Sequence, residues 1–185
     1  MRIFPLAAVA VAVTVAGCGS NSSSKSTSTS ASKPPATTGR EASPPGDIPD
    51  NQAYVAYSPP GSGFSVKVPE GWARTQAGAV TTFTDKLNTI KMSAKSGSCP
   101  TQAALKAQQP GNITTVKRTA GTALVDTYVA DSKPNPVTGK VHSDDIQLYV
   151  FCKTGKVVDL TLSGPKGADN VDPWKIVTDS LRFTA

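Results

Sequence analysis

The sequence predicts an α+β fold in which an antiparallel β-sheet carries helices packed on it. Several short segments alternate apolar and polar side chains, which is typical of strands with one buried face. Turn sequences rich in Gly and Pro separate these segments, and short turns join antiparallel neighbours. The last segment instead has its apolar residues at helical spacing.

The first predicted elements are short strands joined by tight turns. Residues 54–57 form the first strand, and the sequence Ser-Pro-Pro-Gly-Ser-Gly stops it. Residues 64–68 alternate with period two, so every second side chain faces the core. The inward side chains are Phe64, Val66 and Val68. A Pro-Glu-Gly turn then places Trp72 as a core aromatic residue.

The middle of the chain predicts further strands and one short helix. The strand candidates cover residues 80–85, 88–96, 113–119, 122–130, 146–152 and 158–162. Residues 101–109 consist largely of side chains that tolerate a helix, and a Pro-Gly pair ends it. Residues 131–139 form a loop, and a Thr-Gly pair suits a tight hairpin turn between the last two strands.

The C-terminal segment carries the strongest helix signal. Asp172 is placed to cap the first turn, and Pro173 occupies a position where a missing N–H costs nothing. Trp174, Val177 and Leu181 then fall on one face of the helix. This face is expected to pack on the sheet.

Residues 1–17 predict a lipoprotein signal peptide. A positive charge at Arg2 precedes an apolar run, and the ending Val-Ala-Gly-Cys resembles a bacterial lipobox. The resemblance implies cleavage before Cys18 and a lipid, such as a palmitate-bearing diacylglyceryl group, on its sulfur. The protein is then anchored on the outer face of the bacterial plasma membrane. There are two alternatives. One is a transmembrane anchor, but the apolar run is shorter than the roughly 20 residues needed to span a bilayer. The other is a plain secretory signal, in which Cys18 would have no special role.

Residues 18–50 predict a disordered tether. They are nearly all Ser, Thr, Ala, Pro and Gly, which bury too little apolar surface to offset the entropy of ordering. Such a tether reaches roughly 30 Å from the membrane. It is interpreted as a spacer, and a glycosylated stalk is the alternative. Residues 51–185 then form one domain.

Cys99 and Cys152 are the two cysteines that remain after lipidation of Cys18. In an oxidising compartment they are expected to form a disulfide. The alternative is two buried free thiols that pack as small apolar groups.

The chain is mildly basic, with a net charge of +6. No basic run is interleaved with aromatic residues, so a nucleic-acid partner is not expected. Lys91 and Lys95, with Lys67, are a candidate binding face for an anionic envelope lipid or polymer. The alternative is that these lysines are the solvated side of a one-sided sheet.

Catalytic, metal and cofactor motifs are not found in the sequence. His142 is the single histidine, so a Ser-His-Asp triad would have to use it, and its neighbours suggest a solvated turn. One histidine without an acidic cluster does not suggest a zinc site, and no Gly-rich phosphate loop follows a strand. Trp72 and Trp174 are interpreted as core aromatics, with ligand stacking as the alternative. The protein is therefore not expected to be an enzyme or to need a cofactor.

The layout resembles a PsbP-like domain, an α/β/α sandwich. The resemblance is carried by Gly-Phe-Ser-Val-Lys-Val-Pro-Glu-Gly-Trp at residues 63–72 and by residues 172–183, from Asp-Pro-Trp to Ser-Leu-Arg-Phe. With the lipobox and the tether, the whole chain resembles the LpqN-type mycobacterial lipoproteins. The resemblance implies a non-catalytic module that binds envelope proteins or components. A carrier of a small hydrophobic or lipid ligand is the alternative, and a large apolar cavity would favour it.

Overall fold

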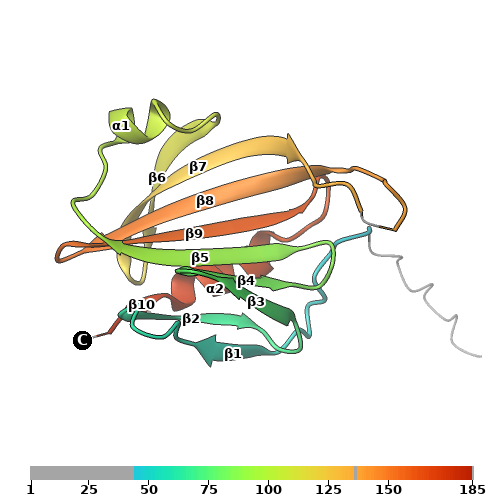
Figure 1. Ribbon diagram of the computed structural model, residues 1–185, viewed down its shortest axis with the longest axis horizontal. Coiled ribbons are helices and arrows are strands. Elements are labelled where there is room, and N and C mark those ends of the chain that lie inside the picture. The colour runs from blue at the N-terminus through green and yellow to red at the C-terminus, as the bar shows by residue number, and fades with distance from the viewer. Residues whose placement is uncertain (1–43, 136, 185) are drawn as a thin grey trace, which may run out of the picture. The chain divides into compact units, whose positions relative to one another are not determined.

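The computed structural model describes residues 44–135 and 137–184. The predicted signal peptide, Cys18 and most of the predicted tether lie outside the described residues. The described chain forms two antiparallel sheets and two helices (Figure 1). The α+β class with an antiparallel sheet is confirmed in this broad form, but the helix content is lower than a sandwich with helical layers on both faces requires.

The larger sheet has seven strands in the order β3-β4-β5-β9-β8-β7-β6, and each neighbouring pair is antiparallel. The strands are β3 (Ala73–Ala77), β4 (Val80–Thr84), β5 (Thr89–Ser96), β6 (Asn112–Arg118), β7 (Gly121–Asp131), β8 (Ser143–Lys153) and β9 (Lys156–Pro165). After β5 the chain forms helix α1 (Gln102–Lys106) and resumes at the far edge as β6. The β6–β9 meander then returns to pair with β5.

The smaller sheet has the strand order β1-β2-β10. Its strands are β1 (Tyr54–Tyr57), β2 (Phe64–Pro69) and β10 (Arg182–Phe183). Helix α2 (Val171–Ser180) packs against β2. The predicted strand at residues 64–68 therefore exists, but it belongs to a separate sheet.

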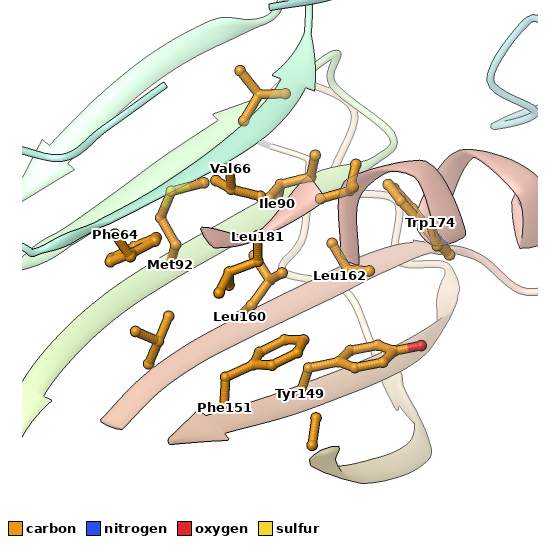
Figure 2. Close-up of a cluster of buried hydrophobic side chains, with 14 of the residues drawn as sticks. Phe64, Val66, Ile90, Met92, Tyr149, Phe151, Leu160, Leu162, Trp174 and Leu181 are labelled. Atoms are coloured by element: carbon orange, nitrogen blue, oxygen red, sulfur yellow. The ribbon is translucent and has the colours of Figure 1, made fainter. Parts of the chain in front are cut away.

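The main core lies between the larger sheet, the smaller sheet and α2 (Figure 2). The face of the larger sheet that meets this core is called the inner face below. Its apolar side chains alternate along the strands, as period two requires. The most buried side chains of the core are Phe64, Val66, Val68, Ile90, Met92, Phe151, Val158, Leu160, Leu162, Val177 and Leu181. Each contributes about 1.5–3 kcal/mol by leaving water. Phe64 and Leu160 are 0% exposed, so the layers shield these core side chains fully from solvent.

A second, smaller cluster lies on the opposite face of the larger sheet, called the outer face. Leu105 of α1 packs there with Ile113, Val150 and Val157. Thr101 caps α1 by accepting a hydrogen bond from the N–H of Ala104 at 3.1 Å. The helix spans 102–106 and is shorter than the 101–109 expected from composition.

The packed domain begins before residue 51, inside the segment assigned to the tether. Ile48 is only 4% exposed and belongs to the main core. Its backbone N–H donates to the side chain of Asn170 at 2.8 Å. One apolar side chain in a polar segment is a weak sequence signal, and this one is buried because α2 supplies both a surface and a hydrogen-bond acceptor.

Two further elements differ from the sequence expectations. Strand β3 was not predicted because all five of its side chains are exposed and do not alternate. Helix α2 starts one residue before Asp172, and its N-cap residue is Asn170. The side chain of Asn170 makes no capping bond, because it is used in contacts with other parts of the chain.

Candidate functional site

Cys99 and Cys152 form a disulfide, as the sequence predicts. Their Cα atoms are 5.7 Å apart across a sequence separation of 53 residues. The bond joins the segment before α1 to the end of β8, on the outer face of the sheet. Together with the Leu105 contacts, it fixes the crossover that carries α1.

The three candidate lysines do not share one face. Lys91 and Lys95 lie on the outer face of the larger sheet, at alternate positions of β5. Lys67 belongs to β2 of the smaller sheet. The ammonium group of Lys95 is also paired with Asp159 at 3.0 Å, which reduces its availability to an anionic ligand. The structure therefore provides no single basic surface made of these three residues.

His142 lies between a serine and an aspartate, but the geometry is that of a hairpin closure. Its Nδ1 is 3.2 Å from Ser132 Oγ, and its Nε2 is 3.1 Å from Asp144 Oδ1. The backbone N–H of Ser132 donates to the carbonyl of His142 at 2.7 Å, and the N–H of His142 donates to Ser132 Oγ at 3.1 Å. The serine hydroxyl also donates to the carbonyl of Lys133 at 3.1 Å. These bonds close the loop between β7 and β8 and leave the hydroxyl occupied.

An open groove of about 380 Å³ lies between the inner face and the start of α2, and it is called the α2 groove. Its floor consists of Thr127, Val129, Asp145, Gln147 and Gly164. Pro165, Ala168, Asn170, Val171 and Trp174 form the opposite wall. Val129 on the floor is 51% exposed and Val171 on the opposite wall is 70% exposed, so each side of the groove offers an apolar side chain to a ligand. Such a groove combines apolar anchoring surface with polar groups that orient a ligand.

A buried asparagine network supports the wall of the α2 groove. Asn170 Nδ2 donates to Asn88 Oδ1 at 2.9 Å and to the carbonyl of Gly46 at 3.0 Å. Asn88 Nδ2 donates to the same carbonyl at 2.8 Å. Position 164 requires glycine, because a Cβ there would overlap Asn88 Oδ1. These bonds hold three segments that are distant in the sequence together at one end of the groove.

Trp174 lines the α2 groove, and most of its side chain is buried in the main core. It is 6% exposed, and its ring meets that of Trp72 edge to face, with centroids 6.5 Å apart. Trp72 is partly buried and packs against the same core. Both tryptophans therefore have the structural role that the sequence suggests, and one of them also borders the groove.

The edge of β7 beside the α2 groove has no neighbouring strand over its last residues. Strand β6 begins at Asn112, opposite Thr127, so residues 128–131 extend beyond it. A two-residue turn at 119–120 joins β6 and β7, so the flanking Arg118 and Gly121 form a hydrogen-bonded pair. Hydrogen-bonded and non-hydrogen-bonded pairs then alternate along the strands, so every second residue of β7 directs its N–H and C=O toward β6. The N–H and C=O of Val129 therefore point toward the missing neighbour, within the described chain.

Asp126 is a buried carboxyl on the outer face, under the segment that leads into β6. It is 0% exposed, and no side chain among the described residues donates a hydrogen bond to its oxygens. Burial raises the pKa of this carboxyl, and the backbone N–H of Gly111 partly opposes that effect. A Cβ at position 111 would overlap Asp126 Oδ1, so this approach requires glycine.

Sequence reasoning did not identify the α2 groove or the free edge of β7. Both arise from the lengths of β6 and β7 and from the docking of α2, which no local pattern encodes. The described residues contain no group of three or more His, Cys, Asp or Glu side chains arranged to hold a metal ion. Over the same residues, no helix is long and apolar enough to cross a membrane.

No protein-family model and no curated protein matches this sequence. Several solved structures match this chain, and they include the following two. A protein of Bacteroides thetaiotaomicron has a TM-score of 0.52 and 16% identity, over 70% of this chain and 48% of that one, so this chain spans about half its length. The solution structure of cyanobacterial PsbP (CyanoP) from Synechocystis sp. PCC 6803 has a TM-score of 0.48 and 16% identity, over 71% of this chain and 93% of that one. The first likeness concerns the fold alone, and the lower score of the second supports no conclusion.

Proposed function

We propose that this protein is a cell-envelope lipoprotein whose folded domain is a non-catalytic module that binds another envelope protein. In the finer assignment it is an LpqN-type lipoprotein with a PsbP-like domain, anchored through Cys18. The lipobox-like leader supports the anchor. The strand at 64–69, its turn to Trp72 and the closing helix α2 support the family assignment.

The observation that carries the binding role is the α2 groove next to the free edge of β7. An extended peptide that adds to this edge would pair with the backbone of Val129 and place alternate side chains over the groove. Two exposed valines, Val129 on the floor and Val171 on the opposite wall, supply apolar contact for those side chains. Gln147 and Asp145 on the floor supply polar groups that fix its register.

A carrier of a small hydrophobic or lipid ligand has less support. A carrier buries most of its ligand in a largely apolar cavity. In the described domain the interlayer space is occupied by core side chains, among them Phe64, Phe151 and Leu160. The α2 groove is open to solvent and has polar residues on its floor, which suits a peptide better than an acyl chain.

The test is photo-crosslinking in living cells with the full-length protein. A photoreactive amino acid is placed at Val129 or Val171 in the groove, or at Thr115 on the exposed edge of β6 as the control position. Protein adducts are expected at the two groove positions and not at Thr115. Adducts are identified by mass spectrometry.

A proline substitution separates edge pairing from general damage. Val129→Pro removes an N–H that has no partner in the domain, so the fold is expected to survive. Thr115→Pro is the matched control because the N–H of Thr115 also faces away from its paired strand. Val129→Pro is expected to abolish the adduct formed from Val171, while Thr115→Pro leaves it unchanged. Adducts that survive Val129→Pro, or a lipid adduct in place of a protein, would contradict the proposal.

A further inference from the structure

A second hollow, of about 400 Å³, lies at the tip of the β8–β9 hairpin and is called the lysine pocket. It is lined by Gly63, Lys153, Thr154, Lys156, Phe183 and Thr184. The hairpin tip and β10 lie at the end of the domain opposite the point where the described chain begins (Figure 1). The described lining residues include two lysines and no acidic side chain.

Lys153 and Lys156 face each other directly across the hairpin. They are register partners on either side of the two-residue turn, so their side chains project from the same face of the sheet. Like charges in directly opposed positions destabilise a strand pair. Within the described residues, neither ammonium group has an ion-pair or hydrogen-bond partner; by contrast, Lys95 is paired with Asp159. An anion between the two lysines would remove this repulsion.

The position of Lys156 depends on the loop before β2. The Nζ of Lys156 lies so close to Gly63 that a Cβ at residue 63 would overlap this nitrogen. Gly63 also has φ +67°, which favours glycine. The carbonyl of Gly63 accepts a hydrogen bond from the N–H of Thr184 at 3.0 Å, which ties the loop to the end of β10. The ammonium group of Lys156 therefore lies against the backbone of Gly63; Lys156 is half-buried, and Lys153 opposite it is exposed.

We propose that the lysine pocket binds a phosphate group carried on a small organic molecule. Two ammonium groups match the charge of a phosphate monoester, and lysine binds phosphate as a point charge. The hydroxyls of Thr154 and Thr184 lie at the same pocket and make no hydrogen bond to other described residues, so they add neutral donors. The volume exceeds that of phosphate alone, and the ring of Phe183 offers an apolar wall for the attached group.

This site is independent of the α2 groove, because the two share no lining residue. A phosphate monoester has two sources in a cell envelope, the headgroup of phosphatidic acid and a soluble phosphate ester. Both present the same group to the lysines. The test therefore includes probes that distinguish them.

The experiment is calorimetric titration of the full-length protein with inorganic phosphate, glycerol 1-phosphate and water-soluble dihexanoyl phosphatidic acid. Lys153→Gln with Lys156→Gln removes both charges. Lys91→Gln with Lys140→Gln is the control of equal net charge, since both residues are exposed and lie outside the pocket. The pocket variant is expected to bind glycerol 1-phosphate about tenfold more weakly or worse, and the control is expected to match the wild type.

A third variant gives a readout that is independent of binding. Lys153→Glu places opposite charges across the hairpin, so without phosphate it is expected to melt at a higher temperature than the wild type. Phosphate is expected to raise the melting temperature of the wild type and not that of this variant. Tighter binding of the lipid than of glycerol 1-phosphate assigns the headgroup, and equal binding assigns the soluble ester. No phosphate binding by the wild type, or undiminished binding after loss of both lysines, overturns the proposal.

Discussion

Substitution of Asn170 by alanine is expected to destabilise the domain strongly. The side chain is 4% exposed and makes three hydrogen bonds, to Ile48, Gly46 and Asn88. Gly46 keeps its bond from Asn88 in the variant, so two groups lose their partner: the N–H of Ile48 and Oδ1 of Asn88. Each unsatisfied buried group costs about 1–3 kcal/mol, so the expected loss for two groups is roughly 2–6 kcal/mol of unfolding free energy. That is a large share of the roughly 5–15 kcal/mol of a typical domain.

The assay is urea unfolding followed by circular dichroism, with Asn51→Ala as an exposed control. Asn51→Ala is expected to change the unfolding free energy by less than about 0.5 kcal/mol. Asn88→Ala combined with Asn170→Ala is expected to cost less than the sum of the single losses, because the two side chains share one network. A loss below about 1 kcal/mol for Asn170→Ala, or strict additivity of the pair, would refute the reasoning.

Three further predictions concern the rest of the domain. Replacing Cys99 and Cys152 by serine is expected to lower the unfolding free energy by about 2–4 kcal/mol in urea titrations, and an unchanged midpoint would show that the disulfide does not constrain the unfolded chain. Because burial raises the pKa of Asp126, the native state holds its proton more tightly than the unfolded state. The stability that Asp126 contributes should therefore fall as the pH rises from about 4 through the raised pKa. In pH-dependent melting, Asp126→Asn should remove this share of the fall and leave the share of Asp144, whose pKa burial also raises. Reversing Lys91 to Glu is expected to leave crosslinking from the α2 groove unchanged, because Lys91 lies on the outer face; loss of the adduct would implicate that face.

Much of the fold is visible in the local sequence. Period-two alternation correctly indicates which side chains of β2 and β9 face the core, because a strand exposes its two sides in turn. The Thr-Gly pair at 154–155 forms the predicted hairpin turn, with both residues at positive φ. The disulfide is visible from the count of cysteines and the compartment that the leader implies.

The candidate sites are less visible, because alternation identifies the buried face of a strand but not the sheet to which it belongs. Lys67 and Lys91 are both outward residues of alternating strands, yet they lie in different sheets. The free edge of β7 exists because β6 starts late, after the chain leaves α1. A local signal was present for the lysine pocket alone: two lysines flank a two-residue turn and must share a face.

The proposed binding role can be tested by native mass spectrometry of the protein released gently from its own cells, because this measurement weighs the intact assembly. We expect a complex with a second protein that is lost when Val129→Pro is introduced and retained with Thr115→Pro. A stoichiometric hydrophobic small molecule without a protein partner would contradict the binding role, since that composition defines a carrier.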